Sequence, residues 1–161
     1  MKIPEPGAPL AELKPIVTGP ADESDGEVSP DGRFLAYLSD EPGRREIYVA
    51  TFGPGGVVGP PVPATKTGVN YLTWSPDGRS IRYRSGGRAM EIAVTTTPSI
   101  SFGPPKELFD ADAKNIRLHN FFADGREIVL IRGEEESDEI RRLSVVLGFS
   151  EELVRKTKAA R

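Results

Sequence analysis

His119 is the single histidine of this 161-residue chain, and the chain contains no cysteine. Zinc sites in proteins draw on Cys, His and acidic ligands, so one copy of the chain lacks the usual set. The acidic run at 134–139 lacks the alternating oxygen ligands and the internal glycine of an EF-hand calcium loop. We therefore predict no metal site. His119 is expected to be an ordinary polar residue on the inner strand of the third repeated unit described below, and the acidic run is expected to be a solvated loop.

Covalent catalysis has little support in the sequence. A hydrolase-type serine nucleophile stands in a Gly-x-Ser-x-Gly turn, and Gly148-Phe149-Ser150 does not supply that pattern. The glycine-rich stretch at 53–56 is not followed by the Gly-Lys-Ser/Thr of a phosphate-binding loop. Without cysteine there is also no thiol chemistry and no disulfide framework. The sequence predicts no catalytic residue and no cofactor.

A polar pentapeptide recurs along the chain and is the strongest signal in it. Ser-Pro-Asp-Gly-Arg occupies residues 29–33 and again 75–79, and its last three letters return at 124–126. The aspartates of the three copies lie 46 and then 47 residues apart. A constant period of this size, with a turn motif between apolar runs, is typical of an array of small sheets.

The repeated motif is predicted to be a tight hairpin turn. Proline presets φ at the first central position, aspartate favours the second, and glycine accepts the left-handed conformation that closes the turn. Because the same residues return in each unit, we assign them to construction of the fold rather than to catalysis. The predicted structural residues are Ser29, Pro30, Asp31, Gly32, Ser75, Pro76, Asp77, Gly78, Asp124 and Gly125.

Short strands flank each turn. In the first unit a polar turn at 18–25 precedes a short strand at 27–28, and the strand 34–38 is apolar at every position, which indicates burial on both faces. Proline-marked segments at 13–17, 61–65 and 105–109 are predicted to be edge strands, because proline cannot donate to a sheet ladder. In the third unit the strand 128–131 is again apolar throughout, and 150–156 is predicted to be a terminal helix capped by Ser150.

One strand departs from this plan. Arg82 and Arg84 alternate with Ile81 and Tyr83, so the two arginines share one face of the strand. Either that face is wet, or the arginines pair with carboxylates such as Glu91, because a buried unpaired arginine is very costly.

Composition narrows the classes of partner and compartment. The formal net charge is -3, so there is no electrostatic argument for nucleic acid, whose binders carry basic patches. No apolar run approaches the length of a membrane span, and the start of the sequence has no signal-peptide core. We expect a protein of the cytoplasm if the chain is complete, and of the periplasm or another extracytoplasmic space if it is a fragment.

These repeats resemble the TolB-type, WD-like β-propeller family. The resemblance is carried by residues 29–51, with the turn, an apolar strand, Ser-Asp, a glycine and Glu-Ile-Tyr-Val, and again by 74–79 and 121–132. The order of the units is further similar to the last blades of propellers fused to bacterial serine/threonine kinases. The resemblance covers about residues 13–154; Phe122-Ala123 depart from it by replacing Ser-Pro.

The resemblance implies an all-β fold of three four-stranded propeller blades, half of a six-bladed propeller, with a short C-terminal helix. We expect a flexible leader at 1–12, a propeller region at 13–149, and a helix or tail at 150–161. Within the propeller region the blades would span about 18–65, 66–109 and 110–149, plus the edge strand 13–17.

We expect a non-enzymatic scaffold or interaction domain, which binds a protein or peptide through loops at one face of the ring, because the inner strands 27–28, 71–74 and 116–121 carry few titratable groups. Propellers host many unrelated activities, so the fold alone does not fix the function. The alternative is a hydrolase- or lyase-type enzyme whose acids, histidine or tyrosines cluster in the central channel.

Three blades raise the question of closure, because propellers typically close with about four to eight. We expect a homodimer in which two arcs complete a six-bladed ring. A fragment of a larger, kinase-linked propeller protein, an open arc, and a remnant whose one property is assembly remain as alternatives. The expected oligomer interface consists of Leu13, Ile16, Val17, Ile128 and Leu130.

Overall fold

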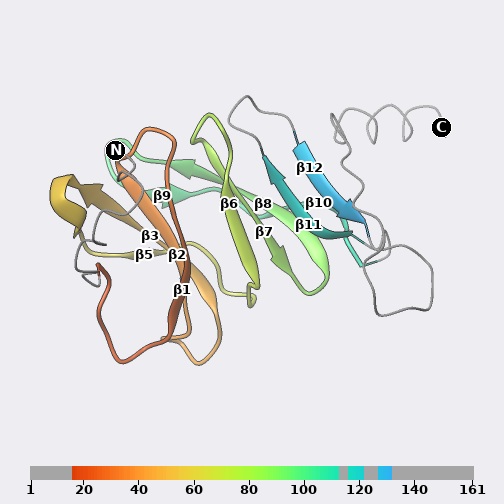
Figure 1. Ribbon diagram of the computed structural model, residues 1–161, viewed down its shortest axis with the longest axis horizontal. Helices are drawn as coiled ribbons and strands as arrows, with labels where there is room; N and C mark the ends of the chain where they lie inside the picture. The colour runs from red at the N-terminus through yellow and green to blue at the C-terminus, as the bar shows by residue number, and fades with distance from the viewer. Residues whose placement is uncertain (1–15, 113–115, 122–126, 132–161) are drawn as a thin grey trace, which may run out of the picture.

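The structure, a computed structural model, describes residues 16–112, 116–121 and 127–131, the last two ranges as backbone alone. Within these ranges the chain forms β-strands and a single 3₁₀ turn, η1, at Pro54–Gly56. The prediction of an all-β protein is confirmed. Figure 1 shows the sheets following one another along the molecule, from β1 to β5 at one end to β11 and β12 at the other.

The first sheet is an antiparallel meander. Its strands are β1 (Glu23–Val28), β2 (Phe34–Ser39), β3 (Glu46–Gly53), β4 (Val57–Val58) and β5 (Val62–Pro63). β1 pairs with β2 and β2 with β3, and the far edge of β3 then pairs with both short strands. This edge is shared because β3 is long enough for β5 to pair at Tyr48 and β4 at Phe52.

The second sheet repeats this arrangement. Its strands are β6 (Tyr71–Trp74), β7 (Ser80–Ser85), β8 (Arg88–Thr95), β9 (Ser101–Phe102) and β10 (Lys106–Asp110). β8 carries both β9 and β10 on its outer edge. The prediction of four strands per unit is therefore wrong for the first two units, because the long third strand of each sheet pairs with two short strands.

Two strands of the third unit are described. β11 (Ile116–Phe121) and β12 (Glu127–Ile131) form an antiparallel pair. The predicted apolar strand 128–131 lies within β12. The remainder of the third unit, the turn residues Asp124 and Gly125, the leader 1–12 and the predicted helix at 150–161 lie outside the described residues.

The start of the first unit differs from the prediction. β1 begins at Glu23 rather than near Glu27, so the end of the predicted turn at 18–25 belongs to the strand. A bulge between Ser24 and Glu27 accommodates these polar residues within the strand pairing. Asp25 takes a positive φ of 51° there, a conformation that aspartate tolerates better than most residues. Ile16 and Val17 form a bend rather than the predicted edge strand; Val17 packs by its side chain instead of pairing by its backbone.

The main core lies between the first two sheets. One face of β2 and β3 packs against one face of the second sheet, while the other face of β2 belongs to a smaller cluster around Tyr37. All six residues of β2 are buried, which confirms the prediction of burial on both faces. The main core consists of Phe34, Ala36, Leu38, Ile47, Val49, Val69, Leu72, Trp74, Ile81, Tyr83, Ile92 and Val94.

Candidate functional site

The first repeated turn, between β1 and β2, is closed by its own side chains. The Ser29 hydroxyl donates to Asp31 Oδ1 at 2.6 Å and accepts from the Phe34 amide at 3.0 Å. Asp31 Oδ1 also accepts from the Arg33 amide at 3.1 Å. Gly32 has φ +75°, which a residue with a Cβ adopts only at a cost. The polar groups of the turn thus satisfy one another.

The second repeated turn, between β6 and β7, has nearly the same geometry. The Ser75 hydroxyl donates to Asp77 Oδ1 at 2.6 Å and accepts from the Ser80 amide at 3.0 Å, and the Arg79 amide donates to Asp77 Oδ1 at 3.0 Å. Gly78 has φ +68°. The structure therefore places all eight predicted residues of these two motifs in equivalent hairpin turns.

Both turn aspartates are held as carboxylates. The hydrogen bonds from Ser29 and then from Arg33 lower the pKa of Asp31 to about 2. The hydrogen bonds from the Ser75 hydroxyl and the Arg79 amide also lower the pKa of Asp77. A general acid or base needs a pKa near the working pH, so neither aspartate suits that role at neutral pH.

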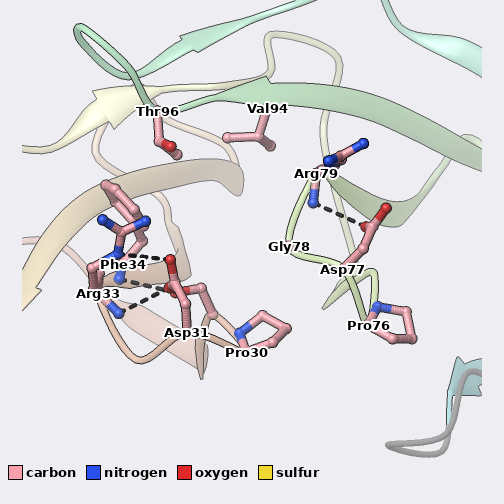
Figure 2. Close-up of a pocket in the computed structure, with 11 residues that line it drawn as sticks. Pro30, Asp31, Arg33, Phe34, Pro76, Asp77, Gly78, Arg79, Val94 and Thr96 are labelled. Atoms are coloured by element: carbon pink, nitrogen blue, oxygen red, sulfur yellow. Dashed lines mark hydrogen bonds and ion pairs between the residues drawn. The ribbon is translucent and has the colours of Figure 1, made fainter.

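The two arginines of the motif behave differently. Arg33 closes its turn by an ion pair with Asp31, Nε to Oδ2, at 2.8 Å, and its guanidinium lies 5.7 Å from the centroid of the Phe34 ring. Arg79 makes no side-chain ion pair within the described part of the chain, and Ser80 replaces the aromatic residue beside it. Figure 2 shows the Arg79 side chain leaving its turn, joined to Asp77 through the backbone amide alone.

An open cleft of about 420 Å³ separates the two turns (Figure 2). The turns approach closely at one point, where a Cβ added to Gly78 would lie 3.6 Å from Pro30 Cδ. The far wall comes from β8 and the residue after it. The lining residues are Ser29, Pro30, Asp31, Arg33, Phe34, Pro76, Asp77, Gly78, Arg79, Val94 and Thr96.

Glu27 joins β1 to β6, the edge strands with which the first two sheets begin. Its carboxylate accepts from the Thr73 hydroxyl and from the Trp74 amide, both at 3.3 Å, and its carbonyl oxygen accepts from the Trp74 indole at 3.1 Å. Burial raises the pKa of Glu27, and these hydrogen bonds offset part of the rise. Burial, followed by the Glu27 charge, also raises the pKa of Tyr71.

Arg82 and Arg84 are paired rather than left in water. Arg82 forms an ion pair with Glu91 at 3.2 Å on the neighbouring strand β8, and Arg84 forms one with Asp112. Glu91 also accepts from the Ser80 hydroxyl at 3.3 Å. Of the two alternatives that the alternating pattern left open, the pairing with carboxylates, Glu91 among them, is confirmed.

Glu46 is a buried carboxylate that the sequence did not single out. It receives hydrogen bonds from the Thr65 hydroxyl at 2.7 Å, the Thr67 amide at 3.1 Å and the Gly68 amide at 3.0 Å, and an ion pair from Arg44 at 2.5 Å. Burial alone would raise the pKa of Glu46, but these donors outweigh it and lower the pKa. Glu46 thus ties β3 to the connection that leads into the second sheet.

The other candidates are placed only in part. His119 lies on β11 opposite Val129; its side chain and the acidic run 134–139 are outside the described residues. Among the residues that are described, no group of three or more His, Asp or Glu side chains is arranged to hold a metal ion. No helix in that part of the chain is long and apolar enough to cross a membrane.

The expected oligomer interface is also placed in part. Ile16 is 48% exposed, and Val17 packs on the cluster of Leu35, Tyr37 and Tyr48 at the outer face of the first sheet. Ile128 and Leu130 lie on β12, opposite Asn120 and Leu118 of β11. Leu13 is outside the described residues.

No protein-family model and no curated protein sequence matches the chain. Among solved structures the chain is similar to TolB from Acinetobacter baumannii, with a TM-score of 0.37 and 14% sequence identity. The match covers 82% of this chain and 44% of the TolB chain. The chain thus spans less than half the length of that structure.

Proposed function

We propose that the sheets are blades of a β-propeller, and that the chain is a non-enzymatic module that binds a protein or peptide through the loops at one face. Two successive meanders with equivalent turns support this proposal, because a propeller repeats such sheets about one axis. A binding role for the loops suits this fold, because binding residues are often found on loops that a rigid scaffold of sheets holds in place.

The observation that carries the proposal is the cleft between the two turns. Its two sides are hairpins held rigid by the serine and aspartate hydrogen bonds. The exposed residues Pro30 and Pro76 add apolar rings to the lining, and the exposed residues Arg33 and Arg79 add charged groups. A pre-formed recess with mixed apolar and charged walls loses little entropy on binding an extended peptide.

Peptide display on the full chain tests this proposal. Thr96 lines the cleft and neighbouring Thr95 does not, so Thr96→Trp fills the recess and Thr95→Trp is the matched control. We expect peptides selected on the wild-type chain to lose about tenfold or more in affinity for Thr96→Trp, which is about 1.4 kcal/mol, and to keep their affinity for Thr95→Trp. Failure to select any peptide, or peptides indifferent to Thr96→Trp, would count against the proposal.

An enzyme with its site at the innermost strands is the second candidate. The neighbouring Glu27 and Tyr71 favour it, because a carboxyl group with a raised pKa is a feature of general acids and bases. Chromogenic ester, phosphate and glycoside substrates would be incubated with the wild-type chain and with Glu27→Gln. We expect no turnover by either; turnover that Glu27→Gln abolishes would support the enzyme instead.

Ring closure by a second copy completes the proposal. Two arcs of three blades would form a six-bladed ring, with a fragment of a longer propeller as the alternative. Ile16 and Val57, 48% and 68% exposed, support the second copy because they leave apolar side-chain surface uncovered at the first sheet.

A further inference from the structure

We propose that Arg79 anchors a carboxylate-binding subsite in the cleft between the two turns, and that the subsite takes a peptide carboxylate. This inference rests on the proposed binding function, and names the chemistry that the cleft would select. The carboxylate can belong to the C-terminus of the peptide or to an Asp or Glu side chain, since both present the same planar group.

The asymmetry between the two turns is the first step. Both turns contain the same five residues, yet Arg33 pairs with Asp31 while the Arg79 side chain has no ion-pair partner within the described residues. The residue that follows explains the difference. Phe34 offers its ring face to Arg33, a favourable position for a guanidinium, whereas Ser80 offers none to Arg79.

The state of the two aspartates is the second step. Asp31 is neutralised by Arg33, and Asp77 directs Oδ1 to the Ser75 hydroxyl and the Arg79 amide. Their carboxylates are therefore engaged with the turns, while the guanidinium of Arg79 keeps its planar set of donors for another partner. An arginine fork matches a carboxylate by two parallel hydrogen bonds.

The rest of the lining suggests the neighbouring part of the ligand. Pro30, Phe34 and Val94 give the cleft an apolar wall, and Val94 lies next to Arg79, to whose carbonyl its amide donates at 2.8 Å (Figure 2). Apolar side chains beside the carboxylate would lose water against this wall, which favours binding in proportion to the apolar area covered. The expected ligand is thus an extended peptide with apolar residues next to a carboxylate.

Three short peptides test the inference on the full ¹⁵N-labelled chain by NMR titration. The first is acetyl-Ala-Leu-Val with a free C-terminus, the second is the same peptide amidated, and the third is amidated acetyl-Ala-Leu-Val-Glu. We expect the first, the third or both to bind about tenfold or more tightly than the second, with the Arg79 and Ser80 amide signals moving. Binding of the first alone identifies a C-terminal carboxylate, and binding of the third alone identifies a side-chain carboxylate.

Arg79→Gln should remove that preference for the acid peptides, while Arg45→Gln, an exposed arginine outside the cleft lining, should keep it. Arg79 is exposed, so an unchanged unfolding midpoint is expected to show that the variant folds. Three results would overturn the inference. The acid and amide peptides could bind equally, Arg79→Gln could keep the preference for the acid peptides, or none of the three peptides could bind at 10 mM (roughly −2.7 kcal/mol). Display-selected peptides that still respond to Thr96→Trp would then show that the proposed function survives without it.

Discussion

Glu27 and Glu46 carry the same side chain, but the folded structure raises the pKa of Glu27 and lowers the pKa of Glu46. Each carboxylate bridges two parts of the chain that are distant in sequence, but Glu46 receives four hydrogen-bond donors and Glu27 receives two, both long at 3.3 Å. Hydrogen bonds to the charged form lower a pKa and burial raises it. The number of donors therefore decides which way each group shifts.

Replacing Glu46 by glutamine should destabilise the chain at neutral pH. The amide cannot accept from all of the present donors, and loss of a hydrogen bond to a charged group costs about 1.5–3 kcal/mol. Because the folded pKa is lowered, the stability that Glu46 contributes is present above its unfolded pKa of 4.5 and is lost as the pH falls through the folded value. Urea unfolding across acidic and neutral pH should show the difference between Glu46→Gln and the wild-type chain shrinking in acid. A constant difference would contradict this assignment.

Replacing Glu27 by glutamine should have the opposite dependence on pH. Its folded pKa is raised, so the ionised carboxylate is disfavoured in the folded chain, and its contribution to stability is present below the unfolded pKa and is lost as the pH rises through the folded value. Glu27→Gln removes the charge and keeps one acceptor oxygen, so it can accept from either Thr73 or Trp74. The unfolding free energy of Glu27→Gln relative to that of the wild-type chain should therefore be higher at pH 7 than in acid. Glu27→Ala, which removes the acceptors, should be destabilised at both pH values.

The sequence predicts the role of a residue more readily when its hydrogen-bond partners are close in the chain, which is not the case for these two carboxylates. The turn role of Asp31 and Asp77 follows from neighbours two residues away, so the repeated motif sufficed to predict it. Glu46 depends on Thr65, Thr67 and Gly68, some twenty residues further on, and Glu27 depends on Thr73 and Trp74 in the next sheet. Nothing in the local pattern identifies partners at that distance. The cleft could not be predicted either, because it exists only where two turns approach.

At the scale of elements, β2 and β7 are the second strands of their sheets, but equivalent positions carry apolar side chains in β2 and charged side chains in β7. Positions 36 and 38 of β2 are alanine and leucine, both fully buried between the two sheets. The corresponding positions 82 and 84 of β7 are arginines paired with Glu91 and Asp112. The first two sheets therefore meet through an apolar interface, while the far face of the second sheet is ionic.

This contrast predicts unequal effects of truncation at equivalent positions. Leu38→Ala should cost about 2–5 kcal/mol, because it leaves a cavity in the main core. Arg84→Ala should cost about 1 kcal/mol or less, because its ion pair with the exposed Asp112 is of the weak surface kind. Chemical denaturation of the two variants checks the difference. Similar losses would mean that the ionic face carries as much of the stability as the apolar one.

The strand boundaries in the structure agree with the predicted ones where turn residues or prolines mark the ends of a strand. The repeated turns delimit β2 and β7, and the prolines near 61–65 and 105–109 lie at β5 and β10. β1 was predicted too short because its bulge at Asp25 hides a strand inside a polar stretch. β4 and β9 were missed because two-residue strands have no periodicity; the long partners β3 and β8 specify them.

At the scale of the whole molecule, the outer face of the first sheet bears on the proposed closure of a ring by a second copy. Leu35, Tyr37 and Tyr48 are buried there under Val17 and its neighbours. Ile16 lies beside the 3₁₀ turn, its Cγ2 only 3.1 Å from the place a Cβ would take on Gly56, and Val57 follows that turn. The two exposed side chains thus leave apolar surface uncovered beside the 3₁₀ turn, suited to contact with another chain.

If a second copy supplies that blade, the chain should sediment as a dimer, and Ile16→Lys combined with Val57→Lys should convert it to a monomer. Full burial of an aliphatic side chain contributes about 1.5–3 kcal/mol, so two charged replacements should weaken association by about a hundredfold or more. Thr95→Lys, an exposed change on the second sheet, is the control and should leave the dimer intact. A stable, non-aggregating wild-type monomer in dilute solution would contradict the homodimer. That result would favour the alternative proposed above, a fragment of a longer propeller.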